Sequence, residues 1–356
     1  MKILFIIAAI LFTGAIAEEV KESIKLGGSF RYRHEMFIID GKDNRNRQRV
    51  AAKASLKAKV VPSVSVKFEL ASGGATARSA NATLDNAFTK KDLFINQANF
   101  HWAPEFGQGL SLTGGKMKNP FAKVGKSELV YDSDFVPEGI ALQYAKDYGS
   151  LSAFMNAAGI WVEEESSSDD VMLYAGQLGV SLPFADKKAA FTIGTGYYFH
   201  DGLKGTGPYE EGKSFGNSAD TAKALLEDYT PWEVFAELGM KISGVPASLF
   251  GHYVQNFAAD DDNVGFLAGV TLGKVKKPGS LGFRAYYRYM QKDAVFALTS
   301  DSDFGGGTTD NQGVELNADV GIANNIKGSV TYFINSAGLD NGTSYQRGQF
   351  DVKFTF

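Results

Sequence analysis

The sequence has 356 residues and a net charge of −4, with 40 Gly, 27 Phe and 15 Tyr but no Cys. The lack of cysteine excludes a disulfide framework and thiol chemistry. The slightly acidic balance argues against a nucleic-acid partner, because such partners are held by basic surfaces. After residue 17 no apolar run reaches the ~20 residues of a membrane-spanning helix, so membrane insertion would have to rest on strands.

The first residues have the pattern of a secretory signal peptide. Lys2 precedes the apolar run Ile3–Phe12, and small residues follow as far as Ala17. A charged start, a short apolar core and small residues before the cleavage site are typical of exported proteins. We therefore predict cleavage after Ala17, with residues 1–17 as the signal peptide and residues 18–356 as one exported barrel domain.

The rest of the chain alternates between polar and apolar residues with a period of two, which predicts β-strands with two different faces. In Arg47–Val60, for example, Val50 and Ala52 share one face, and Arg49 and Lys53 share the other. The predicted strands, in chain order, are Ile24–Met36, Arg47–Val60, Val64–Leu70, Leu93–Trp102, Leu110–Met117, Gly139–Ala145, Leu151–Trp161, Val171–Leu182, Ala189–Phe199, Trp232–Lys241, Ala247–Gln255, Val264–Gly273, Leu281–Met290, Gly313–Val320, Ile326–Asn335 and Tyr345–Phe356.

The connections between these strands alternate in length. Short turns such as Pro62-Ser63 and Asn324-Asn325 fall on one side, and long loops such as Ser72–Lys91 and Asp201–Pro231 fall on the other. This pattern is typical of a transmembrane antiparallel β-barrel of about 16 strands in a bacterial outer membrane. A large secreted β-protein remains an alternative, because alternation alone does not distinguish lipid from a dry core. Within the longest loop, Ser218–Asp228 is expected to form a short helix capped by Ser218.

The last predicted strand carries its apolar residues at alternate positions, namely Phe350, Val352, Phe354 and Phe356. Such a strand is expected to close a barrel against the first strand and so to leave no free edge. The segment resembles the C-terminal insertion signal of bacterial outer-membrane proteins. That resemblance implies recognition by the barrel-assembly machinery through these four residues.

The connection after the fifth strand, Lys116–Glu138, is long and contains the apolar core Leu129-Val130-Tyr131. Here the chain resembles the Gram-negative porins: the trimeric general-diffusion porins and, more closely, the putative porin family. The resemblance implies an inward-folded third loop that forms the constriction, a homotrimer, and an outer-membrane location in contact with lipid and lipopolysaccharide. The chain departs from general porins in the basic residues at the start of this loop, Lys116, Lys118, Lys123 and Lys126, which leave the sign of any charge selectivity open.

Closure of the barrel would bring basic residues of the last strand and of the first three strands onto one arc of the inner wall. We expect this arc to contain Arg31, Arg33, Arg49, Lys53, Lys67 and Lys353, and the loop that faces it to contribute Lys116, Lys118, Glu128, Asp132 and Asp134. Opposed charges across a narrow water column favour small polar solutes. Each basic residue taken alone is better explained as an ordinary solvated inward residue, whereas for the arc as a whole the two explanations are about equal.

The sequence thus predicts a passive, water-filled channel for small hydrophilic solutes and ions. The alternatives are a substrate-specific channel, for instance an anion-selective one, and a barrel that does not transport, such as an enzyme or an adhesin. The four histidines (His34, His101, His200 and His252) fall on different strands, and none stands in a recognisable catalytic motif. No catalytic residue, metal site or cofactor is predicted.

Overall fold

The computed structural model describes residues 23–207 and 212–356; the predicted signal peptide, residues 1–17, lies outside the described residues. The described part is almost entirely β-structure, with three short 3₁₀ turns at Glu105–Gly107, Ala297–Thr299 and Phe304–Gly306. Within it, no helix has the length and apolar character needed to cross a bilayer.

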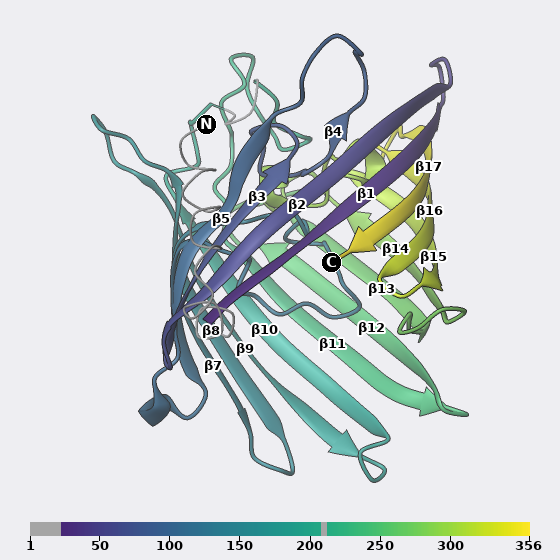
Figure 1. Ribbon diagram of the computed structural model, residues 1–356. Coiled ribbons are helices and arrows are strands. Elements are labelled where there is room, and N and C mark those ends of the chain that lie inside the picture. The colour runs from purple at the N-terminus through teal and green to yellow at the C-terminus, as the bar shows by residue number, and fades with distance from the viewer. Residues whose placement is uncertain (1–22, 208–211) are drawn as a thin grey trace.

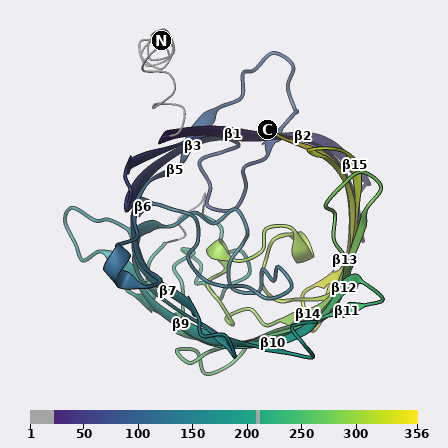
Figure 2. The same cartoon turned by 60° about the horizontal axis from the view of Figure 1, so that its bottom comes forward.

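The strands form one sheet that closes on itself (Figures 1 and 2). Their bounds are β1 Ile24–Ile39, β2 Arg45–Val61, β3 Val64–Ser72, β4 Ala82–Thr83, β5 Leu93–Trp102, β6 Leu110–Lys116, β7 Glu138–Asp147, β8 Ser152–Glu163, β9 Val171–Phe184, β10 Ala189–Asp201, β11 Pro231–Ile242, β12 Val245–Asn256, β13 Val264–Gly273, β14 Leu281–Met290, β15 Asn311–Ala323, β16 Ile326–Ala337 and β17 Thr343–Thr355. Sixteen of these strands form the ring, each antiparallel to its neighbours, as predicted. The two-residue strand β4 is additional and pairs with β2 beyond the end of β3.

The predicted closing strand does close the ring. β17 pairs antiparallel with β1, from Ser29 opposite Thr355 to Ile39 opposite Tyr345. The last residue continues the ladder: the Phe356 N–H donates to the Gly28 carbonyl oxygen at 3.0 Å, and the Gly28 N–H donates to the Phe356 carbonyl oxygen at 2.8 Å. A Cβ on Gly28 would lie 2.7 Å from the Lys53 carbonyl oxygen, so the close approach of the strands needs glycine there.

Alternate residues of each strand face opposite sides of the wall. On β1 the side chains of Phe30 and Tyr32 are 39% and 42% exposed, whereas Arg33 and Glu35 are 5% and 0% exposed. Apolar side chains therefore cover the outer surface, and charged ones are buried inside. This arrangement is expected of a barrel in a lipid bilayer, because charged side chains are stable in its polar interior and not against lipid.

Long loops extend from one end of the barrel and short turns from the other (Figure 1). Three long loops matter for the lumen. We call residues 73–92 the second loop, residues 117–137 the third loop and residues 291–310 the seventh loop. Figure 2 looks toward the inside of the ring and shows loop segments occupying much of it.

The prediction of a short helix at Ser218–Asp228 is wrong. These residues form turns with an isolated bridge between Ala219 and Leu225. Ser218 does not cap a helix: its backbone N–H and its hydroxyl both donate to the carboxylate of Asp293 in the seventh loop. A tertiary contact therefore outweighs a local helix signal that is weak in so short a segment.

Candidate functional site

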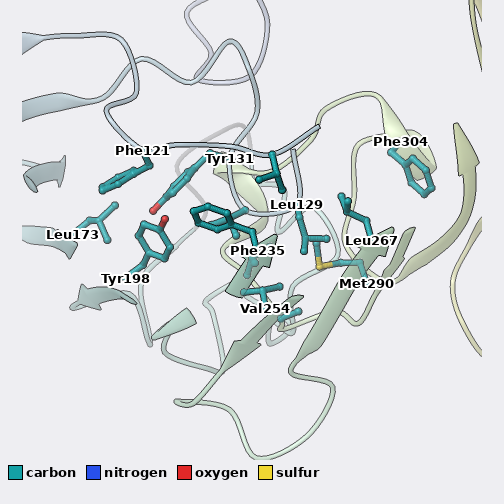
Figure 3. Close-up of a cluster of buried hydrophobic side chains, with 14 of the residues drawn as sticks. Phe121, Leu129, Tyr131, Leu173, Tyr198, Phe235, Val254, Leu267, Met290 and Phe304 are labelled. Atoms are coloured by element: carbon teal, nitrogen blue, oxygen red, sulfur yellow. The ribbon is translucent and has the colours of Figure 1, made fainter. Parts of the chain in front are cut away.

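The third loop lies inside the barrel. It follows β6, and its apolar side chains pack on the inner faces of β7 to β14 (Figure 3). Leu129 is completely buried, Tyr131 stacks between Phe121 and Phe135, and Tyr198 of β10 meets the ring of Tyr131 edge-on. Several inward positions of this half of the wall are apolar, as at Phe235 and Leu267. Burial of these side chains explains why this loop is not in solvent.

Hydrogen bonds fix the loop backbone to the wall at several strands. The Ala122 N–H donates to Gln177 of β9 at 2.8 Å, and the Gly125 N–H donates to Glu237 of β11 at 3.0 Å. At the loop tip, Arg284 of β14 donates to the carbonyl oxygens of Gly125 and Lys126 at 3.2 and 3.1 Å. The loop therefore extends inside the barrel from β6 to β14.

A further anchor joins the loop to the wall through a histidine. The Ser127 hydroxyl lies 2.8 Å from Nδ1 of His252, and Nε2 of His252 lies 2.7 Å from a carboxylate oxygen of Glu233. The order serine, histidine, carboxylate is that of a catalytic triad. All three side chains are buried, however, and the Ser127 oxygen already accepts the N–H of Leu129. We interpret the group as a structural tether, which the sequence did not reveal because its members are far apart along the chain.

The seventh loop also enters the lumen and packs on the third. The Asp132 N–H donates to the Thr299 carbonyl oxygen at 2.7 Å, and the Ser302 N–H donates to the Asp132 carboxylate at 2.9 Å. The second loop joins them, because Arg78 donates to the carbonyl oxygen of Asp301 at 3.1 Å. Three loops thus meet at the long-loop end of the lumen. The apolar residues of Ala294–Leu298 were the one sequence signal that the seventh loop would be buried.

The residues predicted for the basic arc belong to β17, β1, β2 and β3, which are neighbours in the sheet, and the third loop approaches this part of the wall at one point. Nζ of Lys53 lies 3.0 Å from Oδ1 of Asp134. Beside it, Arg31 donates to Asn81 of the second loop at 2.6 Å and lies 4.0 Å from Asp351. Lys53, Asp134 and Arg31 therefore form the place where loop and wall approach one another.

Arg33 and Arg49 belong to a different arrangement, centred on Glu35, which is fully buried. The arginines nearest to the Glu35 carboxylate are Arg33 at 3.5 Å, Arg49 at 3.8 Å, Arg347 at 2.5 Å, and Arg47. We call Glu35 and these four arginines the Glu35 cluster. Sequence reasoning missed Glu35, although its inward position follows from the alternation of β1.

Two further carboxylates neutralise the Glu35 cluster. Asp351 of β17 accepts two parallel hydrogen bonds from Arg33, both at 2.7 Å. Asp303 of the seventh loop lies 2.9 Å from Arg347 and 3.4 Å from Arg33. Burial alone would raise the pKa of Asp303, but Arg347 and Arg33 outweigh it and lower that pKa far below its usual range. These guanidinium groups are therefore engaged in ion pairs that join strands to the seventh loop.

The remaining predicted residues lie at three different places. Lys67 and Lys118 line a cavity below the third loop, and Lys67 pairs with Glu69 at 2.9 Å. Lys353 is an exposed inward residue at the short-turn end of β17. Lys116 faces outward: it pairs with Glu138 across β6 and β7, on the same face as Ile140, which is 51% exposed. Strand alternation places Lys116 there, because it is the last residue of β6 and not part of the loop.

Three carboxylates meet between the third and seventh loops. Glu128, Asp132 and Asp301 have oxygen atoms within 4.8 Å of one another, which is a spacing suited to a metal ion. Arg288 lies 3.2 Å from Asp301, and the Lys123 ammonium donates to the backbone carbonyl oxygens of Tyr131 and Asp132. Cations of the chain thus already lie beside the acidic group.

Burial also favours the protonated form of two of these carboxyl groups. Burial, and then the neighbouring Asp301, raise the pKa of Asp132 to about 7. Burial and the carboxylates of Asp132 and Asp301 also raise the pKa of Glu128 well above its usual value. Because burial favours the neutral form of both carboxyl groups and cations of the chain already lie beside them, we assign no metal ion here.

Comparisons with known proteins agree with this architecture. No curated protein sequence matches the chain significantly. Among solved structures, the fold is similar to OprB of Pseudomonas putida at high pH (TM-score 0.65, 12% identity, 96% of each chain covered). It is also similar to OmpF of Salmonella typhi (TM-score 0.56, 12% identity, 94% of this chain and 97% of that one) and to the trimer form of OmpT of Vibrio cholerae (TM-score 0.54, 12% identity, 94% and 100%). A family model described as "Putative porin" matches residues 21–229 and 237–356, so the chain belongs to this family of outer-membrane porins.

Proposed function

We propose that the protein is a passive, water-filled channel for small hydrophilic solutes and ions, with selectivity set at the third loop, residues 117–137. The observation that carries the proposal is the path of this loop across the lumen, with Asp134 3.0 Å from Lys53 on the opposite wall. A loop held inside a barrel by buried apolar side chains narrows the passage at a fixed height. Solutes that pass it are sorted by size and charge.

The charges at the narrow point support selectivity. Arg31, Lys53 and Lys353 lie on the wall, and Asp134 is on the loop. Opposed charges in a low-dielectric mouth act on a passing ion more strongly than they would in bulk water. Arg33 and Arg49 contribute less in this proposal, because the carboxylate of Glu35 lies beside both.

Assembly and location are part of the same proposal. The family supports insertion into the outer membrane, in contact with lipid and lipopolysaccharide. A homotrimer is proposed because the similar OmpT structure is described as a trimer. Phe350, Val352, Phe354 and Phe356 remain the proposed signal for the barrel-assembly machinery, after cleavage of the signal peptide at Ala17. No catalytic step is proposed.

Reconstitution in a planar bilayer tests the channel. We expect steady ohmic steps in KCl, in groups of three if the protein is a trimer. Lys53→Ala should move the reversal potential across a KCl gradient toward cation preference, whereas Lys42→Ala, on an exposed outer loop, should not. A correctly folded barrel without conductance would overturn the proposal. An unchanged reversal potential in Lys53→Ala would remove this residue from the constriction.

A second candidate is a channel specific for one class of solute. It is favoured by a cavity of about 810 Å³ that lies directly against the third loop and is lined mainly by polar and basic side chains. A general pore shows no saturation with solute, while a specific one shows a block of ion current that saturates.

A further inference from the structure

The cavity of about 810 Å³ lies in the lumen between the third loop and the walls of β2, β3, β5, β6 and β7. Its charged lining consists of Lys57, Lys67, Lys118, Lys123, Lys126, Arg284, Glu128 and Asp132. Six cations thus face two carboxylates. Its volume falls in the range of about 300–1,000 Å³ that is typical of small-molecule sites in proteins.

Half of these cations are already engaged. Lys67 lies 2.9 Å from Glu69, and Arg284 is paired with Glu315. The Lys123 ammonium group donates hydrogen bonds to backbone carbonyl oxygens of the third loop. These contacts fix the shape of the cavity, and they reduce what the three groups can offer to a solute.

The other three lysines are not compensated. Across residues 23–207 and 212–356, Lys57, Lys118 and Lys126 form no ion pair and no side-chain hydrogen bond. Burial, and then the ammonium of Lys327, lower the pKa of Lys126. The two carboxyl groups in the lining offset this charge only in part, because burial raises the pKa of Glu128 and raises that of Asp132 to about 7.

A neutral donor in the lining is also free. Oδ1 of Asn119 accepts the N–H of Phe121 at 3.0 Å, but its Nδ2 is buried without a partner. A buried N–H group without an acceptor is costly unless a solute or water occupies the space in front of it. The free groups of the cavity are therefore donors and cations, which an oxygen-rich anion matches.

The positive character continues toward the short-turn end. A second cavity, of about 700 Å³, lies beyond the loop tip and shares Lys123, Lys126 and Arg284 with the first. Its other charged residues are Lys187, Lys188, Lys241, Lys274, Lys327, Glu237 and Asp319. A solute that leaves the first cavity thus meets a further region in which cations outnumber carboxylates.

We propose that the cavity against the third loop is a binding site for small oxyanions with two negative charges, such as a dicarboxylate or inorganic phosphate. Lys57, Lys118 and Lys126 supply the charge, and Nδ2 of Asn119 supplies a directed hydrogen bond. The proposal deepens the proposed function and rests on it, since the solute reaches the site through the channel. The site lies on the short-turn side of the constriction, so an anion pauses there after passing Lys53.

Equilibrium dialysis tests binding without any need for conductance. The detergent-solubilised full-length barrel would be dialysed at low ionic strength against phosphate, succinate and, as a neutral control, sucrose. We expect saturable binding of phosphate, succinate or both, no binding of sucrose, and weaker binding in 1 M KCl because salt screens the lysines. Phosphate alone or succinate alone would identify the source of the oxyanion.

The triple variant Lys57→Gln, Lys118→Gln, Lys126→Gln should bind the anion about tenfold more weakly, since three charges near the ligand are lost. The matched control Lys42→Gln, Lys90→Gln, Lys204→Gln removes three charges from exposed outer loops and should bind like the wild type. Equal loss in both variants would overturn the proposal, because it would show an effect of net charge only. Asn119→Ala should weaken binding as well, with the barrel intact.

Bilayer recordings then separate the two proposals. Phosphate or succinate on the short-turn side should reduce the KCl current in a saturable way in the wild type and not in the triple lysine variant. A channel that conducts KCl but neither binds nor is blocked by these anions would overturn the anion site and leave the channel standing. A barrel that binds phosphate without conducting would overturn the channel and leave the site standing.

Discussion

The two ends of the lumen differ in how their cations are held. At the long-loop end, Arg33 and Arg347 are buried against Glu35, Asp303 and Asp351. At the short-turn end, lysines line open cavities, and several of them form no ion pair. Both regions would look alike in a count of basic residues.

The difference follows from desolvation. A guanidinium group removed from water must be paired, because an isolated buried charge is very unfavourable. Once paired, it presents little net charge to a solute a few ångströms away. A lysine in a wet cavity has no such requirement, so its full charge acts on whatever enters. We infer that the arginines hold the loops in place and that the lysines select the solute.

The largest expected effect comes from breaking the paired end. Glu35→Gln removes the carboxylate shared by four arginines, and we expect a loss of about 3–5 kcal/mol in the free energy of unfolding, since it leaves buried cations without a partner. The measurement is the urea midpoint of the refolded barrel. Glu138→Gln, which removes an exposed partner of Lys116, is the control and should change the midpoint little. Similar midpoints for the two variants would mean that the Glu35 cluster is not needed for stability.

The next effect concerns the loop itself. Leu129→Ala takes a fully buried side chain out of the contact between the third loop and the wall, at a cost of about 2–5 kcal/mol to that contact. We expect larger and noisier single-channel currents with an unchanged barrel, because the loop is released while the strands stay paired. Leu142→Ala, on the outer surface, should leave the current as it is. If the Leu129→Ala variant gave the same steady current as the wild type, the hydrogen bonds of the third loop would be sufficient to hold it in place.

The sequence was sufficient for the barrel and for the faces of its strands. Alternation is a local property, so Arg31 or Lys53 is placed inward without knowledge of any partner. The outward face of the closing strand also followed, since Phe350 and Phe354 are four positions apart and share one side of a strand. The inward path of the third loop was predicted by resemblance and is explained by its buried apolar residues.

The partners of those inward residues could not be predicted from the sequence. Asp303 meets Arg33 across 270 positions of the chain, and Ser127 meets His252 across 125. Such contacts depend on where three loops settle in a shared space, and no periodicity records that. The distinction between engaged and free cations, on which the proposed selectivity depends, therefore appeared only with the fold.

A weaker effect is expected with pH where the two inward loops meet. Burial raises the pKa of Asp132 from 3.8 to about 7, so the protonated form is favoured in the folded contact. The contribution to stability is complete below about pH 4 and is lost as the pH rises through about 7. Hydrogen exchange of the third and seventh loops, corrected for intrinsic rates, should show protection that falls over this range.

Asp132→Asn is the matched variant for this pH effect. The substitution also removes one of the two side-chain oxygen atoms that accept N–H groups here. The variant is therefore compared by the pH dependence of its hydrogen-exchange protection and not by its absolute protection. This pH dependence should disappear. A slope that persists in Asp132→Asn would assign the titration to another group, with Glu128 as the first one to replace.

The smallest effect, and the sharpest comparison, comes from two lysines only two positions apart. Lys116 lies on the outer surface beside Glu138, whereas Lys118 lines the cavity below the third loop. Lys116→Gln should leave the reversal potential in a KCl gradient unchanged, because a charge outside the barrel wall does not act on ions in the lumen. Lys118→Gln should move it measurably toward cation preference. If both variants shifted it equally, the net charge of the barrel would set selectivity, and the division between paired arginines and free lysines would have no bearing on transport.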